Sequence, residues 1–191
     1  SSTPQDRREL MDLVERMQGA FTTIAKSKIP TIALAHGFCI GGATSLVSAC
    51  DIRLATKDAK FSIGETKLGL VADVGVIQRM PKIVSSGDMN ELALTGRIFD
   101  GEHAEKIRFV SKAYGNSDEL FEAGEKLANE ISSNSKRIVQ ATKEALEKSS
   151  NLTVDQGLEY AKLWSTSFLV SEDLREGVMA FLEKRDPKFN E

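Results

Sequence analysis

Two adjacent glycines, Gly41 and Gly42, separate a short apolar run from a run of small residues in HGFCIGGATSL, residues 36–46. If a helix begins at this pair, the N–H groups of its first turn have no partner within the helix. Because glycine has no Cβ, a ligand oxygen can approach that backbone closely. Such N–H groups suit an anionic oxygen, either a phosphate or an oxyanion that forms during a reaction. Taken alone, the pair has a simpler interpretation, which is close packing of a helix against a strand.

The elements around the pair follow from the pattern of apolar residues. Residues 5–26 have apolar side chains at three- and four-residue steps, which predicts an amphipathic helix that ends before Pro30. The run TIALAHG, residues 31–37, predicts a short buried strand, and residues 41–51 predict a short helix that begins at the glycines. The glycine pair is therefore expected at a strand-to-helix turn.

The rest of the chain divides into an α/β part and a helical part. Residues 51–63 predict two brief strands around a polar turn at Lys57-Asp58, and residues 65–75 predict a loop punctuated by glycine. Beyond this loop the pattern is helical almost throughout. The predicted helices and caps are a helix through MNELALTG capped by Ser86 or Asp88, helices over 117–131 and 134–149, and two further helices capped by Thr153 and Ser171.

Composition excludes several classes of protein. The chain has 191 residues and a net charge of -3, which gives no reason to expect a nucleic acid or an anionic membrane as partner. No apolar run reaches the ~20 residues that span a membrane. The two cysteines, Cys39 and Cys50, lie in apolar context without metal-ligand spacing, which predicts buried thiols. No GxGxxG pattern and no Walker lysine accompanies the glycines, so a nucleotide loop is not expected.

Nearly the whole chain resembles the enoyl-CoA hydratase/isomerase (crotonase) family. The resemblance is carried by KIPTIALAHGFCIGGATSLVSACDIRLATKDAKFSIGETKLGLVADVGVIQRMP, residues 28–81, and again by EGVMAFLEKRDPKF, residues 176–189. It implies an α/β fold that is a spiral of β-β-α turns with a C-terminal helical trimerisation region. We therefore expect a spiral core over residues 1–115, with the family's N-terminal turns absent from it, and a helical region over 116–191.

The resemblance also gives the glycine pair a chemical role. Members of the family bind coenzyme A thioesters and hold the thioester oxygen with two backbone N–H groups. One of those donors corresponds to Gly42, beside Gly41 in the substrate-binding turn, and Ala43 stands where the family usually has a third glycine. Fixed amide dipoles stabilise the enolate that forms when a proton leaves C2, and one such donor typically contributes ~3–4 kcal/mol.

The catalytic acids are expected at Glu65 in SIGET and Asp73 in LVADVG. In the family, both positions carry acids in dienoyl-CoA isomerases, which the surrounding string resembles most. Without the resemblance, Glu65 would read as a solvated loop residue and Asp73 as a turn former. Ser45 stands where hydratases keep a glutamate and dienoyl-CoA isomerases an aspartate, and we expect it to be mainly structural, with a hydroxyl that is available to hydrogen-bond substrate or Glu65 in the substrate-binding site.

These residues favour isomerisation over hydration. Hydration in this family uses two carboxylates to hold one water, and Ser45 removes one of them. Shifting a double bond needs a base at C2 and an acid further along the acyl chain, which Asp73 and Glu65 would provide. We predict a Δ3,5-Δ2,4-dienoyl-CoA or Δ3-Δ2-enoyl-CoA isomerase of fatty-acid β-oxidation. Two alternatives stay open, an enoyl-CoA hydratase that uses Glu65 and a catalytically weak, oligomeric acyl-CoA-binding scaffold.

The remaining expectations come from the resemblance. Leu70 and Val71 are expected to line the acyl pocket, and Phe181 and Lys184 to help cover the coenzyme A moiety. The implied partners are an acyl-CoA substrate and further copies of the chain, as a homotrimer or homohexamer, with no nucleic acid and no membrane span. No cofactor and no metal is expected, since coenzyme A is part of the substrate. Family habit points to a peroxisome or the mitochondrial matrix, although no targeting signal is visible.

Overall fold

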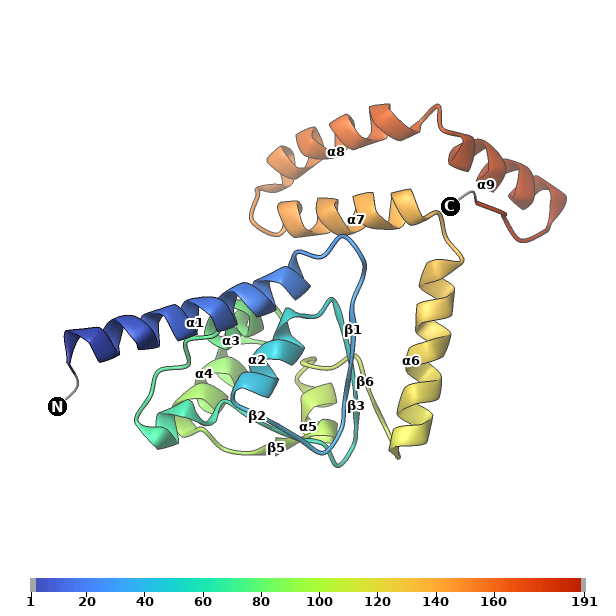
Figure 1. Ribbon diagram of the computed structural model, residues 1–191. Coiled ribbons are helices and arrows are strands. Elements are labelled where there is room, and N and C mark those ends of the chain that lie inside the picture. The colour runs from blue at the N-terminus through green and yellow to red at the C-terminus, as the bar shows by residue number, and fades with distance from the viewer. Residues whose placement is uncertain (1–2, 190–191) are drawn as a thin grey trace. The chain divides into compact units, whose positions relative to one another are not determined.

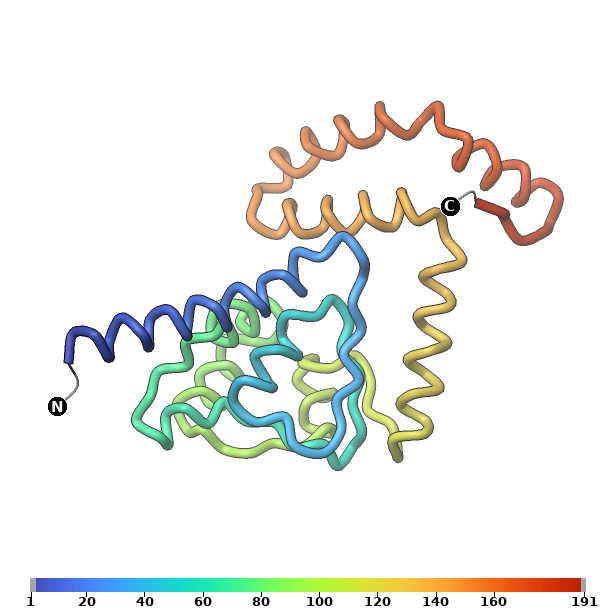
Figure 2. The backbone as a smooth tube through the Cα atoms, viewed as in Figure 1, coloured from blue at the N-terminus to red at the C-terminus, as the bar shows by residue number. Residues whose placement is uncertain are grey.

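The computed structural model describes residues 3–189, which form two compact units (Figures 1 and 2). The first unit contains the chain up to residue 27 together with residues 31–125. The second contains residues 28–30 and the chain from residue 126 onward. Each unit has its own elements and is described by itself.

The first unit opens with helix α1 (Pro4–Ala25), which confirms the helix predicted over residues 5–26. A capping box starts it, because the Thr3 hydroxyl accepts the Asp6 N–H at 3.2 Å and the Asp6 carboxylate accepts the Thr3 N–H at 2.7 Å. These bonds satisfy donors that a helix start leaves without partners. Backbone and side chain together hold the Asp6 carboxylate as an anion, which lowers its pKa.

Two small sheets form the centre of the first unit. One is all parallel with the strand order β1-β3-β6 and the other has the order β2-β4-β5, in which β5 runs antiparallel to β4. Their bounds are β1 (Ile32–Ala35), β2 (Phe38–Ile40), β3 (Ile52–Thr56), β4 (Lys60–Ser62), β5 (Phe99–Asp100) and β6 (Lys112–Tyr114). The predicted strands correspond to β1, β3 and β4, whereas β2, β5 and β6 are additional.

The strands β1 and β2, and again β3 and β4, form pairs in which the first strand belongs to one sheet and the second strand to the other. The chain bends at Gly37 between β1 and β2, and it turns at Lys57-Asp58 between β3 and β4. The Lys60 N–H donates to the Gly37 carbonyl at 2.7 Å, so the two bends lie one over the other. Each pair is a β-β unit stacked in parallel on the next, and this arrangement brings the ends of β2 and β4 to one edge of the second sheet.

The core of the first unit is built on three aromatic rings. Phe61 of β4 lies 5.5 Å from the ring of Phe99 and 5.4 Å from that of Phe109, centroid to centroid, and all three side chains are buried. Edge-to-face and offset arrangements at such distances stabilise beyond simple burial. Apolar side chains from the surrounding helices, Met80 and Leu92 among them, complete this core.

Short helices connect and cover the strands. They are α2 (Gly42–Ala49), the 3-10 helix η1 (Gly64–Leu68), α3 (Val76–Arg79), the 3-10 helix η2 (Met80–Lys82), α4 (Ser86–Thr95) and α5 (Gly101–Lys106). The predicted cap of α4 is wrong, because Ser85 rather than Ser86 or Asp88 is the N-cap. The Ser85 hydroxyl accepts the Asp88 N–H at 3.1 Å, which only the residue three positions before Asp88 can do in this geometry.

Gly101, at the start of α5, is a position where the fold requires glycine. A Cβ built there would lie 1.9 Å from the carbonyl oxygen of Thr56, a backbone atom that cannot move aside. We expect Gly101→Ala to destabilise the protein by about 3 kcal/mol or more through overpacking. Gly87→Ala is the matched control, because Gly87 is exposed in α4 and has room for a methyl group, and it should be neutral or slightly stabilising. Urea denaturation measures both, and equal midpoints for the two variants would contradict the expectation.

The second unit is helical. Helix α6 (Ser117–Ser132) leads into it, followed by α7 (Lys136–Ser149), α8 (Val154–Phe168) and α9 (Glu172–Glu183), and α7 and α8 lie side by side (Figure 1). The predicted caps Thr153 and Ser171 are confirmed. Ser135 caps α7 and also donates to the Asp173 carboxylate at 2.6 Å, which ties the start of α7 to α9. No helix among residues 3–189 is long and apolar enough to cross a membrane.

The segment after α9 is held by hydrogen bonds to the carboxylate of Glu176. Its carboxylate accepts two bonds from the Arg185 guanidinium, at 2.6 and 3.0 Å, and one from the Lys188 N–H at 2.7 Å. The bonds from Arg185 and then from Lys188 lower the pKa of Glu176 to about 2. Because this pKa is lowered, the stabilisation is fully present above the ordinary value of about 4.5 and is lost as the pH falls toward 2.

We expect the protection factor of the Lys188 amide against hydrogen exchange to fall across the same pH window. Glu176→Gln should reproduce that loss at neutral pH, because the amide group cannot pair with Arg185 as a charge. Glu183→Gln is the control, since Glu183 also contacts Arg185 but accepts nothing from Lys188 in the described structure. Exchange measured by NMR would contradict the account if Lys188 were equally protected in the wild type and in Glu176→Gln.

Candidate functional site

The glycine pair lies where β2 ends and α2 begins. Gly41 has φ 58° and ψ −116°, a conformation that favours glycine, and its N–H donates to the Ser62 carbonyl at 2.9 Å. Gly42 is the first residue of α2, so its N–H is one of the first-turn donors that the helix itself leaves without a partner. Apart from its chain neighbours and the backbone of α2 itself, no atom of the described residues lies within 4 Å of a Cβ built on Gly42, so the space on that side of the residue is open.

Glu65 is brought to the same turn by strand pairing. Since β2 and β4 are parallel, with Ile40 opposite Ser62, the segments that follow them leave the sheet at the same edge. Glu65 lies in the first turn of η1, and its Oε1 is 3.4 Å from a Cβ built on Gly41. Its Oε2 is buried and has no hydrogen-bond partner among residues 3–189. The carboxylate therefore packs directly on the bare backbone of the glycine turn.

Ser45 lies one helical turn after Gly41, in α2. Its N–H donates to the Gly41 carbonyl at 3.1 Å, within the first turns of α2. The side chain is fully buried, and its hydroxyl has no hydrogen-bond partner within the described chain. Gly41, Gly42, Ser45 and Glu65 thus form one cluster, which we call the glycine-turn cluster.

Asp73 lies on the loop between η1 and α3. Its side chain is exposed and makes no hydrogen bond or ion pair with any other residue in the range 3–189. Its carbonyl accepts a bond at 2.6 Å from Gln18 of α1, and both α1 and α3 pack on α2. The backbone of Asp73 is therefore tied to α1, which itself packs on α2, and no contact within the described chain joins the Asp73 side chain to Glu65.

Leu70 and Val71 lie on the loop that leads from Glu65 to Asp73. The Leu70 N–H donates to the Glu65 carbonyl at 3.0 Å, and the two apolar side chains are 61% and 77% exposed. Exposed apolar side chains next to a site are typical of a binding surface. Their role in holding an acyl chain stays a prediction.

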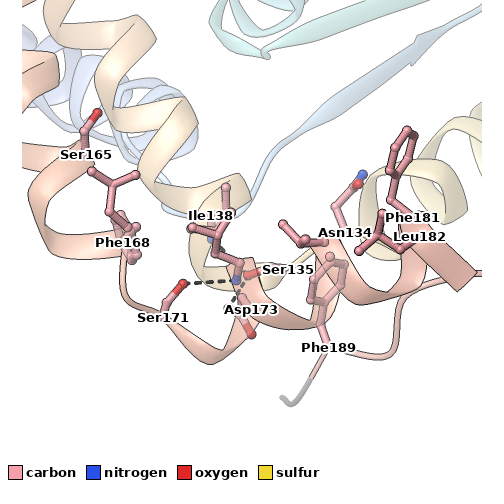
Figure 3. A pocket seen from close by; sticks show the side chains of 14 residues that line it. Asn134, Ser135, Ile138, Ser165, Phe168, Ser171, Asp173, Phe181, Leu182 and Phe189 are labelled. Carbon is pink, nitrogen blue, oxygen red and sulfur yellow. Dashed lines mark hydrogen bonds between the residues drawn. The ribbon is translucent and has the colours of Figure 1, made fainter.

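Phe181 and Lys184 belong to the second unit. Phe181 is 83% exposed and lies at an apolar cavity of about 520 Å³ between α7, α8 and α9 (Figure 3). Lys184 ends α9 in the left-handed conformation, with φ 55°. Both residues are therefore accessible on the second unit, and their contact with coenzyme A stays a prediction.

Thr44 is a positioning residue that the sequence did not single out. Its buried hydroxyl contacts the Cys39 carbonyl and lies 3.0 Å from the Ser62 carbonyl, which fixes the first turn of α2 on the ends of β2 and β4. The sequence feature that could have identified Thr44 is its hydroxyl within the run of small residues after the glycines. The neighbouring Cys39 is buried, which raises the pKa of its thiol, whereas Cys50 is half-buried rather than buried as predicted.

The arrangement suits stabilisation of an anionic oxygen next to an acid. The Gly42 N–H lies at the N-terminal end of α2, which is the positive end of the helix dipole. Preorganised dipoles of this kind need no reorganisation when negative charge develops on a substrate oxygen. Glu65 is the acid within the same cluster, and Asp73 is a second acid on the loop between η1 and α3. Among residues 3–189 no group of three or more His, Cys, Asp or Glu side chains is arranged to hold a metal ion.

Comparison with known proteins decides the family. The family model described as Enoyl-CoA hydratase/isomerase matches residues 5–191. The chain belongs to the enoyl-CoA hydratase/isomerase family. The match includes every residue of the glycine-turn cluster as well as Asp73, and it confirms the family resemblance of the sequence.

Named relatives within the enoyl-CoA hydratase/isomerase family are close. The chain is 46% identical over 188 residues to the Dictyostelium discoideum protein named Delta(3,5)-Delta(2,4)-dienoyl-CoA isomerase, mitochondrial, covering 98% of this chain and 64% of that protein. It is 42% identical over 193 residues to the Arabidopsis thaliana protein named Delta(3,5)-Delta(2,4)-dienoyl-CoA isomerase, peroxisomal, covering 99% of this chain and 69% of that protein. The chain thus spans about two thirds of the length of these relatives.

A solved structure supports the fold. A probable enoyl-CoA hydratase/isomerase from Mycobacterium abscessus superposes with a TM-score of 0.91 at 26% identity, covering 99% of this chain and 72% of that one. This confirms the predicted α/β, crotonase-like fold class with a helical C-terminal region.

Proposed function

We propose that the protein is an acyl-CoA double-bond isomerase that converts Δ3,5-dienoyl-CoA to Δ2,4-dienoyl-CoA, or Δ3-enoyl-CoA to Δ2-enoyl-CoA, in fatty-acid β-oxidation. The observation that carries the proposal is the glycine-turn cluster, in which Gly42 begins α2 with an N–H that the helix leaves without a partner and the Glu65 carboxylate lies beside the adjacent Gly41. The identity to proteins named dienoyl-CoA isomerases supports the substrate class.

The reaction would proceed by moving one proton. Asp73 removes a proton from C2, and the electron pair spreads into the thioester carbonyl and the adjacent double bonds. The Gly42 N–H stabilises the negative charge on the thioester oxygen. Glu65 then delivers a proton to the far end of the conjugated system, which leaves the double bonds shifted by one carbon. Positioned acids and bases of this kind typically accelerate a step by ~10²–10⁴.

The other parts of the proposal concern substrate and location. Leu70 and Val71 would contact the acyl chain, and Phe181 and Lys184 would cover the coenzyme A moiety. Coenzyme A belongs to the substrate, and no further cofactor is proposed. A mitochondrial matrix or peroxisomal location is supported by the names of the two relatives.

We infer that residues 116–191 serve oligomerisation, as a homotrimer or homohexamer. Helices α8 and α9 expose many large apolar side chains, which is typical of a surface that another subunit covers. They include Val154, Leu158, Leu163, Leu174, Val178, Met179, Phe181 and Leu182. A mass from light scattering equal to three or six chains would support the inference, and a monomer at micromolar concentration would contradict it.

The test of the proposed function is to offer three substrates and compare rates. A 3,5-dienoyl-CoA should yield the absorbance of the conjugated 2,4-diene, and a 3-enoyl-CoA should yield the 2-enoyl product. Water addition to a 2-enoyl-CoA faster than either isomerisation would instead select a hydratase that uses Glu65. Saturable binding of the thioesters without any turnover would select the acyl-CoA-binding scaffold.

A further inference from the structure

The loop that carries Asp73 has buried side chains on both sides of this residue. Ala72 and Val74 are 6% and 5% exposed, whereas the Asp73 side chain between them is exposed. Burial of the two neighbours therefore leaves the carboxylate on the outside of the loop. Gly75 follows with φ 114°, a conformation that favours glycine. The direction of the Asp73 carboxylate thus depends on how the backbone of residues 72–75 is held.

One tie to this backbone comes from Gln18 of α1. Its side-chain amide donates to the Asp73 carbonyl at 2.6 Å, although the two residues are 55 positions apart in the chain. The carbonyl belongs to the rigid peptide plane that follows the Cα of Asp73, so the bond fixes that plane and with it the ψ angle of Asp73. The bond is exposed, so water competes for both groups and the bond contributes little to stability.

A second tie comes from Arg79, the last residue of α3. Its guanidinium donates through Nη1 to the Val74 carbonyl at 3.4 Å and through Nη2 to the Thr22 hydroxyl of α1 at 3.1 Å. Gly75 leaves room for this arrangement, because a Cβ built on Gly75 would lie 1.8 Å from Nη1. The rigid fork of one half-buried arginine therefore connects the loop to α1.

The two ties start from one face of α1. Gln18 and Thr22 are four residues apart in this helix, which places them one turn apart on the same side. Through them the carbonyls of two consecutive residues, Asp73 and Val74, are connected to α1. Ordering side chains as long as glutamine and arginine costs conformational entropy, which bonds at or near the surface offset poorly. The position of the loop explains their convergence better than stability does.

We propose that Gln18 and Arg79 are positioning residues, which hold the loop of Asp73 in one conformation and thereby set the direction of its carboxylate. The inference rests on the proposed function, in which Asp73 removes the C2 proton. A base acts efficiently only when its oxygen lies within hydrogen-bond reach of the proton that it removes, at ~2.6–3.2 Å between heavy atoms. Misplacement of a catalytic group by about 1 Å lowers a rate by as much as ~10². Loosening of the loop should therefore appear in kcat.

The first test measures the loop without using activity. Gln18→Met removes the amide group and keeps the length and the helix propensity of the side chain. Hydrogen exchange read by mass spectrometry should become about three- to tenfold faster in peptides that cover residues 70–75, because one bond that restrains the loop is lost. Gln5→Met is the matched control, since it removes the same group from α1 where its partner is Glu9. Unchanged exchange over residues 70–75 in Gln18→Met overturns the proposal whatever the activity.

The second test compares kinetic constants with a 3,5-dienoyl-CoA. Gln18→Met should lower kcat about tenfold with KM changed less than about twofold, because the substrate still binds while the base is misdirected. Thr22→Val removes the acceptor that connects Arg79 to α1 and should lower kcat in the same way. Thr23→Val is its control, because the Thr23 hydroxyl donates to the Gly19 carbonyl within α1, and it should retain wild-type kcat and KM.

A double variant separates positioning from a general structural effect. If Gln18 acts through Asp73, adding Gln18→Met to Asp73→Asn should lower the remaining rate by less than about twofold, whereas a merely structural role predicts the same loss in both backgrounds. Faster exchange in the loop with unchanged kcat in Gln18→Met overturns the positioning role. A wild type without isomerase activity contradicts the proposed function and removes the catalytic part of the inference, and the exchange result still decides whether Gln18 holds the loop.

Discussion

Gly42→Pro is expected to lower kcat for isomerisation by 10²–10³ while the fold is retained, because it removes a single N–H group at the place where the enolate oxygen binds. Proline is well tolerated at the first position of a helix, where its missing N–H has no partner in the helix. Gly42 is that position of α2. The loss combines the missing backbone dipole, about 3–4 kcal/mol, with the proline Cδ that takes the place of the amide hydrogen.

The residue before the proline also permits the change. A proline forces its predecessor into an extended conformation. Gly41, at φ 58° and ψ −116°, is near the mirror image of that conformation, which glycine adopts at no steric cost. The Gly41 carbonyl can therefore still accept the Ser45 N–H. Few positions allow an N–H to be deleted with so little strain.

The comparison for this experiment is Gly42→Ala, which keeps the N–H and adds a methyl group where no atom of the described chain lies within 4 Å. It is expected to lose far less kcat than Gly42→Pro, although a raised KM would be understandable if the methyl group crowds the substrate. Thermal unfolding of both variants checks the fold. Equal kcat values for the two variants would contradict a role for the Gly42 N–H.

Asp73→Asn is expected to lower kcat by ~10²–10⁴, because an amide cannot accept the C2 proton. The substitution preserves shape, and the exposed Asp73 side chain has no partner among residues 3–189, so stability should not change. Glu65→Gln should cause a loss of similar size if Glu65 returns the proton. Steady-state rates with a 3,5-dienoyl-CoA measure both.

Asp58→Asn is the control for Asp73→Asn. Asp58 is likewise an exposed aspartate in a turn of the first unit, between β3 and β4. It should retain wild-type kcat and KM. Full turnover by Asp73→Asn, or an equal loss in Asp58→Asn, would remove Asp73 from the mechanism.

Local signals in the sequence predicted the helices well. Apolar periodicity predicted α1, and Thr153 and Ser171 were recognised as caps because capping depends on neighbours within one turn. The same logic failed at α4, where Ser85 and Ser86 are adjacent and equally suitable by type. Strands β2, β5 and β6 have two or three residues each, too few to show an alternation.

The site depended on information that no local pattern contains. Gly41 and Glu65 meet only because β2 and β4 are parallel neighbours, and the sequence alone did not reveal β2. The family resemblance supplied the link between these residues that local reasoning lacked. The unpartnered atoms of Ser45 and Glu65 are properties of packing, so they became visible only with the structure.

The most direct measurement of the central claim is exchange of deuterium into C2 of 3,5-dienoyl-CoA in deuterium oxide, read by mass spectrometry of the substrate that is recovered unconverted, because the product takes its deuterium at the distal carbon. The wild type should label C2, Asp73→Asn should label it at least ~10² times more slowly, and Gly42→Pro should be slowed by ~10²–10³. Labelling at the wild-type rate in both variants would show that neither the Gly42 amide nor the Asp73 carboxylate takes part in forming an enolate.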